Sequence, residues 1–175
     1  MSVSKIFTVL FRCQARAELE APASARGAFI NIGADFDAFQ AVSKVFATAA
    51  SDLLIVDPYF DVKALFEFCS CIPDNTRVRI LVDSSHSKLT AALQPGIAKW
   101  RSQFGPTRPI DARATPPKVL HDRLISVDRS AVWILTQSFK DLAARSPASL
   151  QRADADVADA KRDAYEQIWL ASAAL

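Results

Sequence analysis

Apolar residues recur along this chain with two different periods. Between Asp35 and Ala50 they fall at three- and four-residue intervals, which predicts a helix with one buried face. Two unbroken apolar runs follow, Leu53 to Val56 and Val78 to Val82, and such runs are typical of strands buried on both faces. The segment from Val62 to Cys71 between them again has a helical period. This order predicts a parallel pair of strands joined by a right-handed crossover helix.

Two more helices are predicted further along the chain. The segment from Ser87 to Phe104 has a helical pattern, in which Pro95-Gly96 is expected to cause a break or a kink. The last helix begins after a cap at Asp154 or Asp156, because both are good N-cap residues ahead of an apolar stripe that recurs every three or four residues.

The remaining apolar segments predict strands. Val119 to Val127 and Ala131 to Thr136 are joined by the turn-forming triplet Asp128-Arg129-Ser130, which predicts a hairpin. Lys5 to Cys13 predicts a strand because it is rich in Ile, Phe, Thr, Val and Leu, and Ala28 to Ile32 predicts a short one after a loop.

Together these elements predict the α/β class: a mixed, largely parallel sheet flanked by helices, with a hairpin and a helix toward the C-terminus. A chain of 175 residues suits one domain with a substantial core. We therefore expect a single domain over residues 1–175, with its core at about 35–172 and an N-terminal strand and loop extension at 1–34.

Composition adds limits to this picture. Half of the residues are apolar and 23% are charged, as in ordinary globular proteins. The formal charge is only +2, so any phosphate site must be local. The apolar run from Ile6 to Phe11 is too short for a signal peptide or a membrane span. Cys13, Cys69 and Cys71 form neither an even disulfide set nor a metal pair, which favours buried thiols, no metal or cofactor, and a cytoplasmic location.

Candidate chemistry lies in the first strand of the predicted hairpin. His121 and Arg123 are two residues apart, so an extended chain places them on one face, and Asp128 ends the strand. A nucleophilic imidazole needs an orienting acceptor, and a phosphate under attack needs a fixed cation. We expect Asp128 to orient His121, and Arg123 to hold the phosphate. In the alternative interpretation, His121 is a core histidine and Asp128 serves only the turn.

A family resemblance supports the first interpretation. Leu120 to Asp128 resembles the H-x-K-x4-D motif of the phospholipase D-like superfamily, with Arg123 in place of the Lys. Leu135-Thr136-Gln137-Ser138 occupies the position of its Gly-Ser-x-Asn. Ser138 to Leu142 resembles the S-x-K-D-L of prokaryotic members that carry H-x-R, and Leu53 to Asp61 resembles a buried strand ending in D-P-Y-F-D.

The resemblance, which covers about residues 35–172, implies a phospholipase D-like α/β/α sandwich and a metal-independent phosphohistidine mechanism. One histidine attacks phosphorus and a second protonates the leaving oxygen. Because the chain has one motif, a homodimer is implied in which His121 of each subunit takes one of these roles. Arg123 would bind the phosphoryl oxygens, while Thr136 and Ser138 replace the Ser and Asn that contact phosphate in the family.

Asp57 and His86 are secondary candidates for substrate binding. Asp57 directly follows the first buried strand, and His86 comes soon after the second. The carboxyl ends of parallel strands meet at one edge of a sheet, where clefts form. The alternative is that both are ordinary polar loop residues.

Two functions follow from the sequence. The first is a nuclease-type phosphodiesterase, with nucleic acid favoured over lipid because no membrane-binding amphipathic or strongly cationic helix is visible. Small prokaryotic proteins of this kind include nucleases and components of phage-defence systems. The second is a catalytically degenerate module that binds nucleic acid, a nucleotide or a partner protein, which Arg123 and Leu135 favour.

Overall fold

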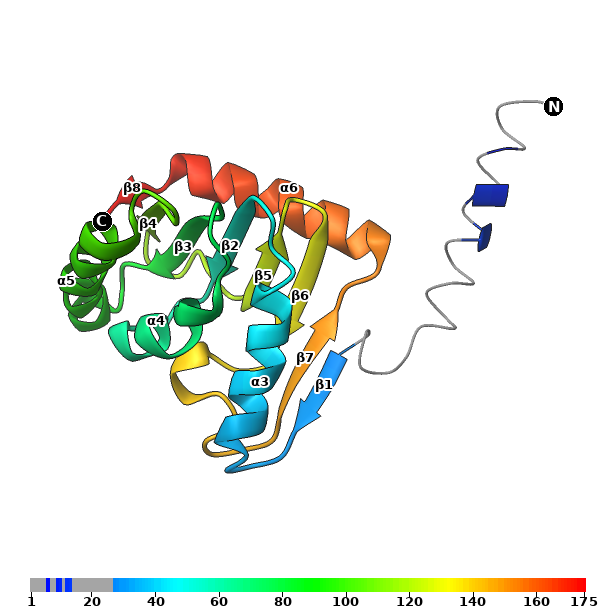
Figure 1. Ribbon diagram of the computed structural model, residues 1–175, viewed down its shortest axis with the longest axis horizontal. Helices are drawn as coiled ribbons and strands as arrows, with labels where there is room; N and C mark the ends of the chain where they lie inside the picture. The colour runs from blue at the N-terminus through cyan, green and yellow to red at the C-terminus, as the bar shows by residue number, and fades with distance from the viewer. Residues whose placement is uncertain (1–5, 7–8, 11, 14–26) are drawn as a thin grey trace.

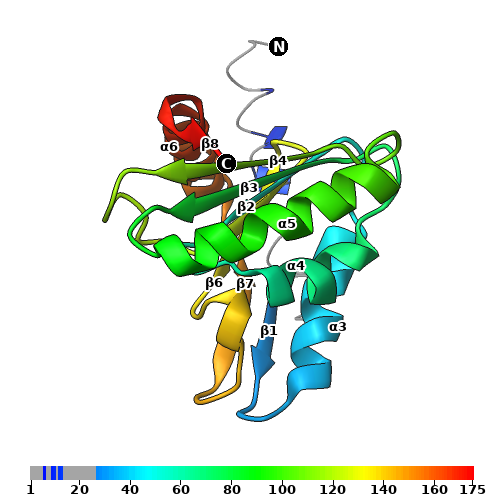
Figure 2. The same cartoon turned by 90° about the vertical axis from the view of Figure 1, so that its left-hand side faces the viewer.

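The computed structural model of this protein describes residues 27–175 together with Ile6, Val9, Leu10, Arg12 and Cys13 (Figure 1). Eight strands form one sheet in the spatial order β1-β7-β6-β5-β2-β3-β4-β8. The helices α3, α4 and α5 cover one face of this sheet, and α6 lies across the other (Figures 1 and 2). The predicted mixed α/β sandwich is therefore confirmed.

The elements follow one another closely along the chain. The strands are β1 (Gly27–Ile30), β2 (Asp52–Val56), β3 (Arg77–Asp83), β4 (Ile110–Thr115), β5 (Leu124–Val127), β6 (Ala131–Leu135), β7 (Ala148–Arg152) and β8 (Ala173–Ala174). The helices are α3 (Asp35–Phe46), α4 (Val62–Phe68), α5 (Ser87–Phe104) and α6 (Ala155–Ala171), with short 3₁₀ turns η1 (Cys69–Cys71) and η2 (Phe139–Asp141).

The sheet is parallel only from β2 to β4, toward the edge formed by β8. β2 pairs with β3, and β3 with β4, in parallel, as the predicted crossover through α4 requires. The other neighbouring pairs in the sheet are antiparallel. The parallel character is thus partial, because the hairpin β5–β6 joins the sheet beside β2 and is extended by β7 and β1, and because β8 pairs with the opposite edge.

Helix α5 differs from its prediction, because it continues through Pro95 and Gly96 without a break. Gly96 lies against α4: a Cβ at this position would come within 2.8 Å of Val62 Cγ2 and 3.1 Å of Leu65 Cδ2. The glycine therefore serves the close approach of two helices, and packing against α4 outweighs the local tendency of Pro-Gly to interrupt a helix.

Two other predicted segments also differ. β5 begins at Leu124, so the chain from Val119 to Arg123 precedes the strand instead of belonging to it. The strand predicted over 5–13 falls partly outside the described residues, and the five described positions within it are helical instead. The loop predicted before β1 lies outside the described residues, and β1 itself is present.

A buried ionic cluster fixes α6 to the sheet. The side chain of Arg79, on β3, has no exposed surface and donates to Asp52 at 2.6 Å and to Glu166 of α6 at 2.6 Å. Its guanidinium also lies 5.3 Å from the ring centre of Trp169. Because Arg79 satisfies two carboxylates from different elements, α6 is held in one position across β2 and β3.

Candidate functional site

Four polar residues from separate parts of the sequence lie at one edge of the sheet. β5 runs antiparallel to β2, and β6 antiparallel to β5, so the ends of β2 and β6 and the start of β5 meet at this edge. Asp57 follows β2, Arg123 precedes β5 and Ser138 follows β6. His86 joins them after β3, which runs parallel to β2.

Asp57 is a fully buried carboxylate at the centre of this group. It accepts hydrogen bonds from the Ser138 hydroxyl at 2.7 Å, the Phe139 N–H at 2.8 Å and the Tyr59 N–H at 2.9 Å. Burial raises the pKa of Asp57, and the three donors together with the charge of Arg123 offset only part of this effect. Asp57 thus holds the segment after β6 in place, and with it the hydroxyl of Ser138.

Arg123 contributes a positively charged guanidinium to the site. Its guanidinium lies 5.6 Å from the ring centre of Tyr59. Its charge acts on the carboxylate of Asp57. The Nε atom of Arg123 is buried and has no hydrogen-bond partner among the residues that the structure describes. Since buried polar atoms in proteins are almost always paired, this donor is suited to an anionic ligand.

An aromatic pair extends the site toward α5. The rings of Tyr59 and His86 have centroids 4.3 Å apart, with 36° between their planes. Tyr59 is therefore flanked by two cationic or titratable side chains, Arg123 and His86. Tyr59 was not among the residues selected from the sequence, and the only signal for it was its position directly after a buried strand.

His121 is exposed. The next residue, Asp122, faces α6, where it accepts hydrogen bonds from Lys161 and Tyr165. The charge of His121 also acts on Asp122. This segment precedes β5, and α6 anchors it through Asp122. The shared face of His121 and Arg123 stays a prediction.

Asp128 lies at the opposite end of β5 from Arg123. Its carboxylate accepts hydrogen bonds from the backbone N–H groups of Ala50, Ser51 and Asp52, at 2.8 to 2.9 Å, and from the Ser51 hydroxyl. Burial alone would raise its pKa, but these donors lower the pKa below the usual range. The structure therefore does not bring Asp128 to His121. Asp128 holds the start of β2, because the antiparallel hairpin carries it away from the motif's histidine.

Thr136 also serves the sheet. Its hydroxyl accepts a hydrogen bond from the N–H of Ser149 at 2.9 Å, and its own N–H donates to the Ser149 carbonyl. These contacts continue the pairing of β6 with β7. Of the two hydroxyl residues in the downstream motif, only Ser138 contacts the group around Asp57.

Asp83 is a buried carboxylate that the sequence did not identify as a candidate site residue. It is the last residue of β3, and its position resembles that of Asp57 directly after β2. It is buried and accepts hydrogen bonds from Ser85 and from the Lys118 N–H. Burial alone would raise the pKa of Asp83, but these donors lower it. This carboxylate connects the loop that carries His86 to the loop that leads to His121.

The described residues contain no cluster of three or more His, Cys, Asp or Glu side chains that could hold a metal ion. Within the same residues, no helix has the length and hydropathy needed to cross a membrane. Of the three cysteines predicted to be buried, only Cys69 is; Cys71 is half-buried and Cys13 is exposed.

The fold of this chain is similar to those of several solved structures. No protein-family model and no curated protein sequence matches the chain. Among solved structures it is similar to Nuc from Salmonella typhimurium, a phospholipase D family member, with a TM-score of 0.60 and 16% identity over 85% of this chain and 98% of Nuc. NucT from Helicobacter pylori gives 0.59 and 11% identity over 86% and 99% of the two chains. The archaeal chromatin protein TrmBL2 gives 0.57 and 14% over 98% and 63%.

The fold is an α/β sandwich. The group around Asp57, Ser138 and Arg123, where β2 and β6 end and β5 begins, includes a buried arginine donor that suits an anionic ligand. The chain's structural neighbours include a phospholipase D family member that it covers almost completely, so the chain has the phospholipase D-like fold. The resemblance seen in the sequence is confirmed at the level of the fold. The roles of His121 and Arg123 stay predictions.

Proposed function

We propose that this protein is a phosphodiesterase, a metal-independent nuclease-type hydrolase with His121 as nucleophile and Arg123 as phosphate-binding residue. The observation that carries the proposal is the buried Nε of Arg123, which has no hydrogen-bond partner in the described part of the chain and lies beside the group formed by Asp57 and Ser138. His121 stands two residues before Arg123 and is exposed. The likeness to Nuc and NucT supports a substrate with a phosphodiester bond.

The chemistry uses two imidazoles and one guanidinium. A ring nitrogen of His121 forms a bond to phosphorus while the bond to the leaving oxygen breaks, and a second imidazole gives that oxygen a proton. Water then attacks the phosphohistidine, loses a proton to the second imidazole, and releases His121. Arg123 donates to the non-bridging oxygens as negative charge builds on them.

The second imidazole is His121 of a second copy of the chain. His121 is exposed and therefore free to meet a partner, and the side chain of Val119 nearby is an exposed apolar group, 40% accessible. A two-fold axis beside this segment would cover Val119 and bring the two His121 side chains together.

Hydrolysis in EDTA tests the enzyme. DNA, RNA and a chromogenic bis-phosphodiester are incubated with the wild type, with His121→Ala, and with Thr136→Ala as a matched control on the sheet side of the motif. We expect turnover that needs no metal, is lost in His121→Ala and is kept in Thr136→Ala. Mixed dimers of wild type and His121→Ala should be inactive, because the shared site needs two histidines; an equimolar, randomly paired mixture should therefore keep about half of the activity per wild-type subunit.

A non-catalytic binding module is the second candidate. Arg123 in place of Lys and Leu135 in place of Gly favour it, and so does the likeness to TrmBL2, a chromatin protein described with a mode of DNA binding. In that case the wild type shows no turnover, and nucleic-acid binding survives His121→Ala. Arg123→Ala should weaken binding under either proposal, since it removes a phosphate contact.

A further inference from the structure

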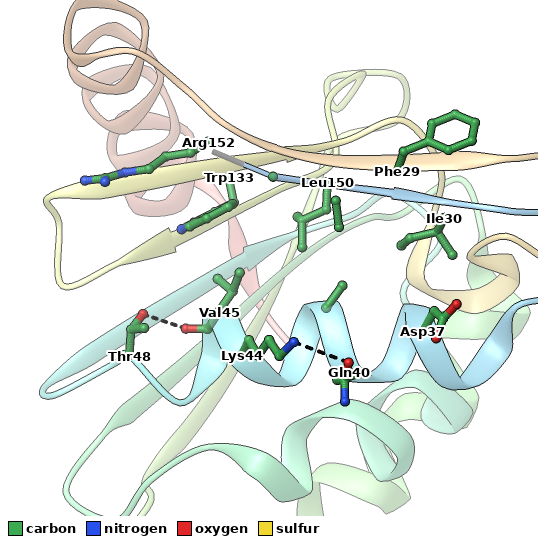
Figure 3. Close-up of a pocket in the computed structure, with 13 residues that line it drawn as sticks. Phe29, Ile30, Asp37, Gln40, Lys44, Val45, Thr48, Trp133, Leu150 and Arg152 are labelled. Carbon is green, nitrogen blue, oxygen red and sulfur yellow. Dashed lines mark hydrogen bonds between the residues drawn. The ribbon is translucent and has the colours of Figure 1, made fainter. Parts of the chain in front are cut away.

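An apolar groove lies between α3 and the strands β1, β7 and β6 (Figure 3). Its volume is about 470 Å³, and its walls include Trp133, Leu150 and Val45. Small residues create the space, because Gly27, Ala28 and Ala41 line it without long side chains. No residue of the candidate site belongs to it.

The charged residues of the groove are separated along α3. Asp37 lies near one end, while Lys44, Thr48 and Arg152 lie toward the other (Figure 3). Asp37 and Thr48 are eleven positions apart, which corresponds to about 16 Å along a helical path. The groove therefore has an acidic end, a basic end and an apolar floor between them.

A second unpartnered apolar surface lies in the N-terminal region. Ile6, Val9 and Leu10 are helical, and their side chains are 42%, 52% and 57% exposed. Residues at i, i+3 and i+4, as these are, share one face wherever a helix is continuous. A helix this short is marginal in water without tertiary contacts, so its apolar face needs a surface to pack against.

We propose that the helix containing Ile6, Val9 and Leu10 docks in the groove of its own chain. Residues 14–26 connect the helix to β1, and thirteen extended residues reach about 40 Å, more than the length of the groove. The chain enters β1 at Gly27, which itself lines the groove. The short connection keeps the local concentration of the helix at the groove high.

Electrostatics fixes the direction of the docked helix. Its N-terminal end, which carries partial positive charge, lies toward Asp37, and its C-terminal end lies toward Lys44 and Arg152. This orientation also brings Cys13 to the end of the groove marked by Thr48. Eight helical residues have a length of about 12 Å, so a helix over 6–13 would fit within the groove.

Disulfide trapping tests this docking in the full chain. Thr48→Cys is made in a Cys71→Ser background, so that Cys13 and the introduced thiol are the reactive pair, while Cys69 is fully buried. Leu170→Cys in the same background is the matched control, because Leu170 is 67% exposed on α6, across the sheet. Under mild oxidation we expect an intrachain disulfide to form at least about tenfold faster in the Thr48→Cys protein than in the Leu170→Cys protein.

Equal rates for the two variants would overturn the proposal. A disulfide that links two chains instead of one would also overturn it, because the occupant of the groove would then be the helix of a second copy.

Alkylation of a groove cysteine gives an independent measurement. Ala41→Cys, in a background with both Cys13→Ser and Cys71→Ser, should react slowly, and Val9→Asp combined with Leu10→Asp should raise its rate several-fold by releasing the helix. Leu170→Asp, which adds a charge elsewhere, should leave the rate unchanged. An alkylation rate that does not respond to the changes at Val9 and Leu10 contradicts the docking, whatever the hydrolysis assays show.

Discussion

Substitution of Asp128 separates a structural role from a catalytic one. The sequence motif places this carboxylate seven residues after His121, where it is expected to orient the imidazole. In the structure it instead accepts three backbone N–H groups at the start of β2. Its own φ is +49°, a conformation that Asn, Asp and Gly tolerate better than Ala.

The expected loss of stability follows from these contacts. The bond from the half-buried N–H of Asp52 is a hydrogen bond to a charged group, worth about 1.5–3 kcal/mol. The bonds from Ala50 and Ser51 are exposed, and water replaces them at a cost of a few tenths of a kcal/mol. Asp128→Gly should therefore lose about 2–3 kcal/mol, and Asp128→Ala about 1 kcal/mol more because of the positive φ.

Urea denaturation monitored by circular dichroism measures these differences, with Asp128→Asn as the matched control that keeps an acceptor oxygen and tolerates the backbone. The pKa of Asp128 is lower in the folded state than in the unfolded state. The carboxylate therefore stabilises the fold above the unfolded pKa of about 3.9, and this contribution is lost as pH falls through the folded pKa. The gap between wild type and Asp128→Asn should shrink below about pH 4.

Two results would refute this reasoning. The first is an Asp128→Ala protein as stable as the wild type. The second is a shift of the His121 ring resonances in the NMR spectrum of Asp128→Asn, because the structure places the two side chains at opposite ends of β5.

Three further substitutions probe the site and its support. Arg123→Ala should weaken binding to a fluorescent oligonucleotide about tenfold and reduce the slope of its salt dependence by about one, as anisotropy measures; an unchanged slope contradicts a phosphate contact. Asp57→Ala should lower the free energy of unfolding by about 3 kcal/mol, since it leaves three donors without their acceptor, whereas a loss below about 1 kcal/mol would show that water replaces it. Arg79→Leu should lower the free energy of unfolding, measured by urea titration, by about 3 kcal/mol, because Asp52 and Glu166 lose their shared partner. An unchanged free energy of unfolding would mean that both carboxylates reach solvent.

The central part of the fold could be predicted from the sequence because its signals are local. The apolar runs that became β2 and β3 are buried on both faces, and the helical period between them gave α4. β7 and β8 escaped prediction because Ala148–Arg152 and Ala173–Ala174 carry little apolar signal of their own. They become strands only by pairing with β6, β1 and β4.

The candidate site was predicted in part for the same reason. Spacing by two predicts His121 and Arg123 on one face, and the structure brings Arg123 to the group around Asp57. Positions seven and more residues apart are different, since a turn or a strand end decides where they point. Asp128 and Thr136 therefore serve the sheet, while Ser138 reaches Asp57 from 81 positions away along the chain.

The sequence by itself determined the class of the fold, the strand–helix–strand unit at its centre and the motif that carries His121 and Arg123, because each depends on residues close together in the chain. Only the tertiary structure decided which polar residues meet. The antiparallel return of β5 and β6 beside β2 brings Arg123 and Ser138 to the buried carboxylate of Asp57 and carries Asp128 away. Contacts between residues so far apart in the chain depend on the order and direction of the strands, which no local sequence pattern encodes.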